Sequence, residues 1–190
     1  MIRELVLKNR SFRRFDPQVK LDELTLRELV ELARCSASAA NLQPLKFILS
    51  WEPNRNALIF EHLAWAGYLT DWPGPSPTER PTGYIIILAD TRICKNVDCD
   101  HGIAAQSILL GAAEKHLGGC MIGSIQREAL QQKLGIPPEY KILLVIALGR
   151  PAEKVVLEEV GADGSIKYWR DNQHVHHVPK RPLQEIILSL

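Results

Sequence analysis

Residues 100–116 read DHGIAAQSILLGAAEKH, the most hydrophobic helical stretch in a chain of 190 residues. Apolar side chains fall on nearly every side of this helix, which predicts that it forms the centre of the core. It is followed by Gly118-Gly119-Cys120-Met121-Ile122-Gly123, in which glycines bracket an apolar stretch. Glycines let a backbone approach a ligand closely, but a helix C-cap followed by a strand has the same pattern. The sequence leaves both alternatives open.

The continuous apolar runs at residues 84–89 and 142–148 are typical of strands buried on both faces. Residues 46–50 predict a shorter strand. Strands and helices alternate along the chain, which indicates a mixed α/β or α+β core with helices packed against one sheet.

Helical spacing is clearest at residues 22–35, where Leu26, Leu29, Val30 and Ala33 recur at intervals of three and four. Further helices are predicted at residues 1–8 (with Leu5 and Val6 inward), 57–69 and 127–134. The density of proline and glycine at residues 71–82 predicts a surface loop. The C-terminal part reads as a polar tail up to Pro182, and residues 183–190 as a short helix or strand.

Composition indicates one globular domain over residues 1–190, with 46% hydrophobic and 24% charged residues. Lys and Arg number 23 against 22 Asp and Glu, a net charge of +1. This balance gives no electrostatic footprint for nucleic acid or for an anionic membrane. The apolar runs fall far short of the roughly 20 residues that span a bilayer.

The cysteines and histidines raise the question of a metal site. The basic N-terminus lacks the apolar core of a secretory signal, so we expect reduced thiols in a cytoplasmic protein. The spacing of Cys94 and Cys99 lies at the permissive limit for zinc, and His174, His176 and His177 cluster near the C-terminus. We expect no metal site, and the role of these side chains stays open. Asp98 and Asp100 are interpreted as a helix N-cap rather than a catalytic pair.

Basic residues gather at both ends of the chain. Arg10-Ser11-Phe12-Arg13-Arg14 places three guanidinium groups and a hydroxyl within five residues. The planar fork of arginine suits phosphate oxygens, although a solvated basic face would have the same composition. Lys180-Arg181 forms a second basic group. If the two ends converge, they make one anion pocket.

Residues 36–44 form a connection with small side chains that is rich in amides. Asn41 and Gln43 can each donate and accept hydrogen bonds, as the edge of a heterocycle requires. An ordinary helix-to-strand connection, in which Asn41 satisfies the loop backbone, is the alternative.

Taken in order, these motifs resemble the flavin-dependent nitroreductase family. The resemblance runs nearly end to end, and although each motif alone is weak, their order is specific. The matching elements are Asn9-Arg10-Ser11-Phe12-Arg13-Arg14-Phe15, residues 36–44 with Lys46-Phe47, Asp100-His101-Gly102-Ile103-Ala104-Ala105-Gln106, Leu117-Gly118-Gly119-Cys120-Met121-Ile122-Gly123, Ala147-Leu148-Gly149-Arg150-Pro151 and Val178-Pro179-Lys180-Arg181-Pro182-Leu183.

The resemblance implies a resident FMN and an α+β nitroreductase-like fold, with a central mixed or antiparallel sheet flanked by helices, in an intertwined homodimer with FMN at the subunit interface. It also assigns roles by position. The FMN phosphate and ribityl chain fall to Arg10, Ser11 and Arg13, with Lys180 and Arg181 closing on the phosphate. The ring falls to Ser38 and Asn41 of the partner subunit, to Gln43, and to the backbone of Ile122 and Gly123.

The implied activity is an NAD(P)H-dependent oxidoreductase. NADH or NADPH delivers hydride to flavin N5, and a nitroaromatic, quinone or similar conjugated acceptor then takes it in a ping-pong cycle. No catalytic side chain is expected, because the cofactor carries the chemistry. Two alternatives stay open at this point: a flavin-binding or storage protein with little turnover, and a small Cys/His metal-binding protein.

Overall fold

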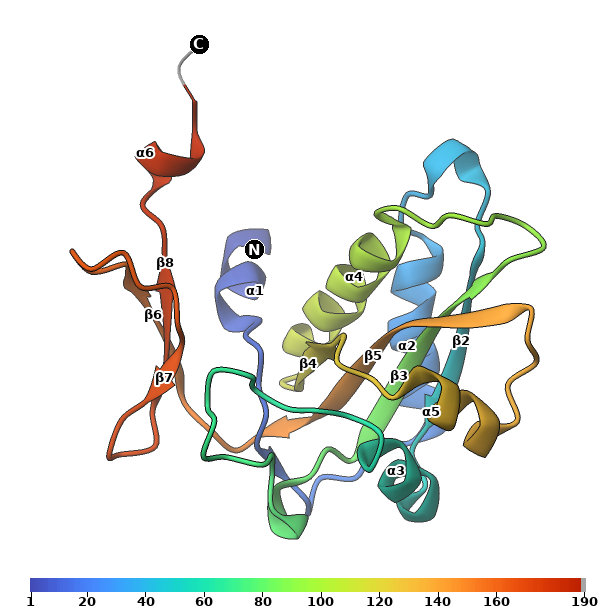
Figure 1. Ribbon diagram of the computed structural model, residues 1–190, viewed down its shortest axis with the longest axis horizontal. Helices are drawn as coiled ribbons and strands as arrows, with labels where there is room; N and C mark the ends of the chain where they lie inside the picture. Colours follow the sequence, from blue (N-terminus) through green and yellow to red (C-terminus); the bar gives the residue numbers. More distant parts are fainter. Residues whose placement is uncertain (189–190) are drawn as a thin grey trace.

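A main sheet, a smaller sheet and the helices around them make up the computed structural model, which describes residues 1–188 (Figure 1). The main sheet contains β1 (Phe15–Asp16), β2 (Leu45–Ser50), β3 (Gly83–Asp90), β4 (Gly118–Ile122) and β5 (Tyr140–Pro151), and the smaller one β6 (Val155–Glu159), β7 (Trp169–Arg170) and β8 (His176–Lys180). The helices are α1 (Ile2–Lys8), α2 (Glu23–Arg34), α3 (Pro53–Phe60), α4 (Asp100–Glu114), α5 (Arg127–Leu134) and α6 (Leu183–Ile186), with 3₁₀ turns at Ala39–Asn41 and Pro77–Glu79.

Strand β5 organises the main sheet, because it pairs along both of its edges. One edge pairs with β3, and the other with β4 and then with β1. Strand β2 pairs with the far edge of β3, and all of these pairings are antiparallel. Parallel pairing occurs in the smaller sheet, between β6 and β8. Helices together with a mainly antiparallel sheet confirm the predicted α+β class.

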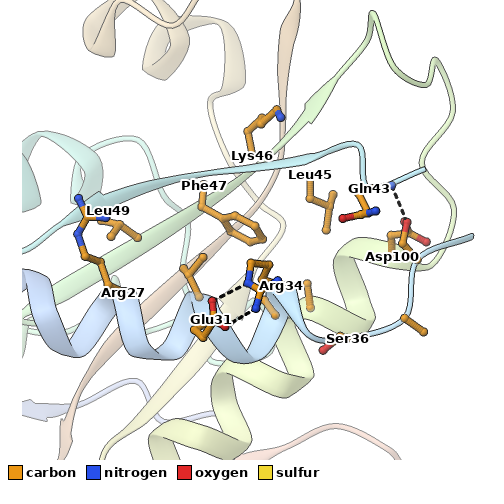
Figure 2. Close-up of a pocket in the computed structure, with 15 residues that line it drawn as sticks. Arg27, Glu31, Arg34, Ser36, Gln43, Leu45, Lys46, Phe47, Leu49 and Asp100 are labelled. Carbon is orange, nitrogen blue, oxygen red and sulfur yellow. Dashed lines mark hydrogen bonds and ion pairs between the residues drawn. The ribbon is translucent and has the colours of Figure 1, made fainter. Parts of the chain in front are cut away.

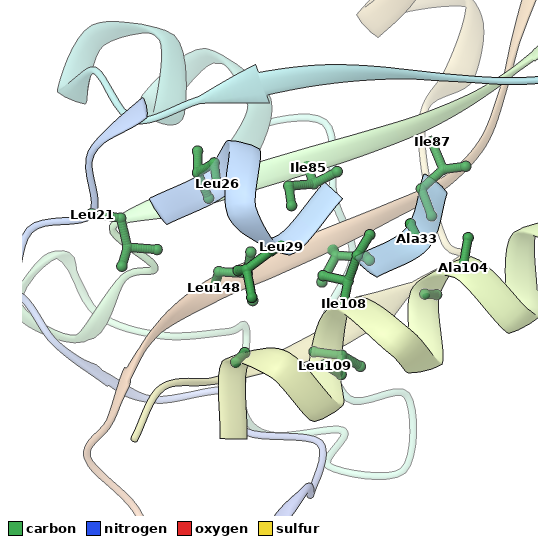
Figure 3. Close-up of a cluster of buried hydrophobic side chains, with 13 residues drawn as sticks. Leu21, Leu26, Leu29, Ala33, Ile85, Ile87, Ala104, Ile108, Leu109 and Leu148 are labelled. Atoms are coloured by element: carbon green, nitrogen blue, oxygen red, sulfur yellow. The ribbon is translucent and has the colours of Figure 1, made fainter. Parts of the chain in front are cut away.

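Two clusters of buried side chains cover the two faces of the main sheet. From β3, Ile85 and Ile87 face α2 and α4, where they meet Leu29 and Ile108 (Figure 3). The alternate residues Tyr84, Ile86 and Leu88 belong to the second cluster, which includes Ile59 of α3 and Leu130 of α5. All eight residues of β3 are buried, as the apolar run predicted. The centre of the core is therefore β3 and β5, and α4 forms one of the outer layers instead of the centre.

The sequence placed α2 correctly. Asp22 caps it by accepting a hydrogen bond from the backbone N–H of Thr25 at 2.8 Å, and the predicted stripe buries Leu26, Leu29 and Ala33.

The helix predicted at residues 57–69 was wrong in its bounds, because α3 begins at Pro53 and ends at Phe60. The segment after Phe60 pairs instead with residues 124–126: Ala64 N–H donates to the Ser124 carbonyl at 3.0 Å.

The small sheet was missed, since its residues are mostly polar and show little periodicity. Aromatic and ionic contacts hold it. His177 stacks on Trp169 at 4.0 Å between ring centroids and lies 3.1 Å from Glu158 and 3.2 Å from Asp171. Two carboxylates raise the pKa of His177 against the opposing effect of its burial. The predicted inward face of α1 was wrong for Val6, which is 43% exposed, whereas Leu5 is half-buried. Beyond α6, residues 189–190 of the predicted C-terminal element lie outside the described residues.

Asp100 is not the N-cap of α4. It is the first helical residue, follows Cys99 at the N-cap position, and is only 4% exposed. Its carboxylate accepts from the Ser38 hydroxyl at 2.6 Å and from the Ala39 backbone N–H at 3.0 Å. The buried carboxylate thus fixes the loop between α2 and β2 to the start of α4.

The same loop contains three non-glycine residues in the left-handed backbone region: Ala40, Asn41 and Gln43, with φ of 48°, 54° and 52°. This region is unfavourable for a residue with a Cβ, so the surroundings must hold it in place. Ser38 does so from inside the loop, since its hydroxyl oxygen accepts from the Gln43 backbone N–H at 2.9 Å.

We predict that Asp100→Ala destabilises the protein and loosens this loop. Two donors of the loop lose a charged acceptor in a buried place, which costs about 1–3 kcal/mol in the free energy of unfolding. Urea denaturation measures the loss, and limited proteolysis reports cleavage within residues 36–44. Asp98→Ala, on an exposed neighbour, is the matched control. Equal stability of the two variants would contradict the anchoring role of Asp100.

We also predict that Gly119→Ala destabilises the sheet where β4 meets β5. A Cβ on Gly119 would collide with the Ala147 carbonyl oxygen and with the side chains of Leu109 and Leu148. Forcing an extra methyl group into such a place costs about 1–3 kcal/mol. The control is Gly102→Ala on α4, where a Cβ meets nothing within 4 Å, so thermal unfolding should show no loss. A Gly119→Ala protein as stable as the control would show that the strands can separate at no cost.

Candidate functional site

The basic segment after α1 runs beside β4. Ser11 forms a bridge with Gly119, and the Phe12 N–H donates to the Gly119 carbonyl at 3.0 Å. Arg10 and Arg13 flank this attachment. The buried carboxylate of Glu153 fixes the segment from the other side, where its Oε1 accepts from the backbone N–H groups of Arg13 and Arg14 and its Oε2 from Arg170 Nη2 at 2.9 Å.

A hollow of about 340 Å³ lies between this segment and the small sheet. We call it the cationic hollow, because Arg10, Arg13 and Lys180 line it together with Ser11. The remaining lining residues are Val6, Asn9, Gln106, Leu109, Met121, Val155, Tyr168, His176 and Val178. Among residues 1–188 this lining includes no Asp or Glu, so the positive charge there is not balanced from within the hollow.

Arg10 shows most directly that the hollow suits an anion. Burial lowers the pKa of its guanidinium, and Nη2 donates to the Val6 carbonyl. Its Nε is buried and has no hydrogen-bond partner among the described residues. A buried donor without an acceptor is costly, and a charged oxygen is the strongest acceptor it can receive. A phosphate group therefore fits this lining.

A second hollow, of about 200 Å³, adjoins the first at the end of β4, and we call it the β4 hollow. Arg13, Met121 and Tyr168 line both hollows. The rest of its lining is Ala64, Trp65, Ala66, Gly67, Cys120, Ile122, Gly123 and Ser124. A Cβ on Gly123 would meet nothing within 4 Å, so the backbone there borders open space. The Nε1–H of Trp65 is a further buried donor that lacks a partner within the described chain.

The buried thiol in the β4 hollow has no sign of reactivity. Cys120 is 4% exposed, and burial raises its pKa, so the thiolate is disfavoured. The site thus presents backbone, aromatic and cationic groups and lacks an activated nucleophile among its lining residues.

The loop at residues 36–44 lies at a different place in the same chain. Ser38 and Gln43 line a larger cavity of about 670 Å³ between α2 and the free edge of β2, and Figure 2 shows Phe47 pointing into it. Ser38 is engaged by Asp100, and Gln43 Nε2 donates to the Asn41 carbonyl at 3.2 Å. Within one chain, the structure does not bring these residues to the cationic hollow.

Arg181 also lies apart from the cationic hollow. Its guanidinium is 3.3 Å from Glu185, in an exposed pair one turn apart on the chain. The residue that reaches the hollow from this end of the chain is Lys180, its neighbour.

The histidines of the C-terminal cluster have separate surroundings. His176 lines the cationic hollow and is 1% exposed, whereas His177 faces Glu158 and Asp171. No group of three or more His, Cys, Asp or Glu among residues 1–188 is placed to hold a metal ion. In that same part of the chain, no helix is both long and apolar enough to cross a membrane.

Three residues of the site escaped the sequence analysis as site residues: Tyr168, His176 and Glu153. The histidine cluster was noticed for its metal-binding potential only, and the local sequence has no signal that places Tyr168 beside Arg13. Glu153 is an acid in a polar stretch, and only the fold shows that it is buried behind two arginines.

Comparison with known proteins agrees with this architecture. The model of the Nitroreductase family matches residues 6–67 and 79–150. A nitroreductase family protein from Streptococcus pneumoniae TIGR4 superposes with a TM-score of 0.73 at 17% identity, over 100% of both chains. One from Clostridium difficile 630 gives 0.69 at 15% identity, over 99% of this chain and 96% of that one.

A third similar structure is an FMN-dependent nitroreductase from Clostridium difficile R20291, with a TM-score of 0.61 and 24% identity over 78% of this chain and 87% of the other. At these identities the likeness shows a shared fold. The family match spans well over half of the sequence and includes the basic segment, the loop after α2 and β4. On this ground, the chain belongs to the nitroreductase family.

Proposed function

We propose that the protein is an FMN-dependent oxidoreductase whose cofactor site is formed by the cationic hollow and the β4 hollow. The observation that carries the proposal is their junction: a cationic lining, to which residues 1–188 contribute no Asp or Glu, adjoins open space beside the backbone of β4. Family membership and the similarity to an FMN-dependent nitroreductase support it. Bound FMN would supply the redox chemistry, hydride exchange at N5 between NADH or NADPH and a nitroaromatic, quinone or similar conjugated acceptor in a ping-pong cycle.

The residues of this chain bind and orient. Arg10, Ser11 and Lys180 would hold the phosphate, and Arg13, which lines both hollows, would reach toward the ribityl chain and the ring. The backbone of Ile122 and Gly123 would lie along the ring, with an N–H available as a donor. Cations near the ring would favour extra negative charge on it.

Arg181 remains a proposed phosphate ligand. The ion pair with Glu185 that now engages it is exposed on both sides, and such a pair contributes little stability. A phosphate bound beside Lys180 would compete for the guanidinium, because charge-assisted hydrogen bonds to phosphate are stronger.

We further propose a cytoplasmic homodimer with two equivalent pockets. The loop that carries Ser38, Asn41 and Gln43 lies away from the hollows of its own chain, so these residues would serve the partner's pocket. Apolar side chains at the two ends of the chain support association: Met1, Ile2 and Leu7 of the N-terminal part and Leu183, Ile186 and Leu188 of the C-terminal part are 54–91% exposed. Exposed apolar surface of this kind favours a partner.

The purified protein should contain FMN. Denaturing it and separating the released flavin by chromatography identifies the cofactor, and release of FAD or of no flavin would contradict the proposal. Steady-state oxidation of NADPH in the presence of menadione then distinguishes an enzyme from a flavin-storage protein with little turnover.

Arg10→Ala and Arg181→Ala should each weaken FMN binding about 10- to 100-fold, which corresponds to the 1.5–3 kcal/mol of a hydrogen bond to a charged group. Fluorescence of FMN released on dilution of the holoprotein measures the affinity. Lys133→Ala, on the exposed surface of α5, should leave it unchanged. If Arg181→Ala behaves like this control, Arg181 is a surface charge and only the segment around Arg10 binds the phosphate.

Sedimentation equilibrium at micromolar concentration should give twice the chain mass of 21.4 kDa. Truncation before α6 removes much of the exposed apolar surface and should shift the equilibrium toward monomer. A wild-type protein of single-chain mass with flavin still bound would exclude a site shared between subunits.

A further inference from the structure

His176 begins β8 and lies against the cationic hollow with 1% of its surface exposed. Its Nε2 is 3.2 Å from Arg13 Nη1, and its ring centroid is 5.2 Å from that of Tyr168. The Arg13 guanidinium in turn lies 4.8 Å above the Tyr168 ring. Imidazole, phenol and guanidinium therefore form one contact group at the junction of the two hollows.

The protonation of His176 follows from its partner. A guanidinium can only donate hydrogen bonds, so Nε2 of His176 must be the acceptor and the proton of the neutral ring must be on Nδ1. Burial, together with the charges of Arg13, Arg170 and His177, lowers the pKa of His176 to about 4. Arg13 belongs to the segment before β1, Arg170 to β7 and His177 to β8. The nearby carboxylate of Glu153 is engaged by Arg13 N and by Arg170.

We propose that His176 is a positioning residue of the flavin site, which holds the Arg13 guanidinium at the junction of the two hollows by accepting its hydrogen bond as a neutral imidazole. This inference rests on the proposed function, because His176 would affect FMN binding only by holding Arg13, which is proposed to contact the cofactor. No role in proton transfer is implied.

A purely structural role does not account for this histidine. Its Nδ1 is buried and has no hydrogen-bond partner among the described residues. A buried donor without a partner is unfavourable, and an apolar side chain of similar size would fill the same space without that cost. What the imidazole adds over such a side chain is an acceptor for Arg13.

The test is a double-mutant cycle between His176 and Arg13, with the dissociation constant of FMN from the diluted holoprotein as the readout. His176→Leu should weaken FMN binding about tenfold, since Arg13 loses an acceptor that fixes it. His176→Gln, whose side-chain oxygen can accept from Arg13, should restore most of the affinity. In an Arg13→Gln background, His176→Leu should cause no further loss.

Two results would overturn the role of His176: unchanged FMN affinity in His176→Leu, or losses that simply add in the double variant. They are distinct from failure of the proposed function, in which the wild-type protein itself would carry no FMN. A second measurement covers a variant that does not fold. Nitrogen NMR of the wild-type holoprotein should show His176 in the Nδ1–H form from about pH 8 to about pH 5, well below the ordinary pKa of histidine. An imidazolium signal at the upper part of this range would overturn the proposal.

Discussion

The antiparallel pairing of β5 on both of its edges is the constraint on which the rest of the molecule depends. With β3 it forms the doubly covered centre of the core, and with β4 and β1 it fixes the two segments that build the site. The end of β4 carries Ile122 to the β4 hollow, and the chain entering β1 carries Arg13 past it. Packing on the two faces of the sheet therefore determines where the cationic segment lies, and core residues such as Leu109 and Cys120 line the hollows beside its arginines.

The electrostatics of the site follow a simple division. Carboxylates face the backbone and the outer arginines, as Glu153 does with the N–H groups of Arg13 and Arg14, and acids are absent from the described lining of the cationic hollow. Glu153 binds the backbone of the basic segment and so fixes its position, while the side chains that line the cationic hollow keep their positive charge. The repulsion among Arg10, Arg13 and Lys180 is therefore not offset by an acid of the lining, and a bound anion would offset it.

How far the sequence predicts this structure depends on the kind of interaction involved. Burial leaves a periodic signal, so α2 and β3 could be located from Leu26, Leu29 and the apolar run alone. The prediction of a helix at residues 57–69 was wrong in its bounds, because the backbone N–H of Ala64 pairs with Ser124, a residue far away in the sequence. The small sheet depends on stacked rings such as Trp169 and His177, which leave no periodic pattern.

For the candidate site, the sequence predicts residue types, and only the fold shows which of them lie together. The residue types at Arg10, Ser11 and Arg13 already indicated an anion, whereas the contact between Arg13 and His176 joins positions that only tertiary structure brings together. The location of Ser38 was also beyond the sequence, because its hydroxyl is directed by Asp100 on a helix that follows much later in the chain.

The anchored loop between α2 and β2 bears on the thermodynamics of assembly. Ordering a backbone costs roughly 1–2 kcal/mol per residue. Here the unfavourable dihedral angles of Ala40, Asn41 and Gln43 are already set within one chain, by hydrogen bonds to Asp100 and Ser38. In the proposed homodimer, a second copy would meet a surface whose shape is fixed in advance. The loop loses its conformational entropy when the chain folds, so association through it would retain more of the free energy gained from contact.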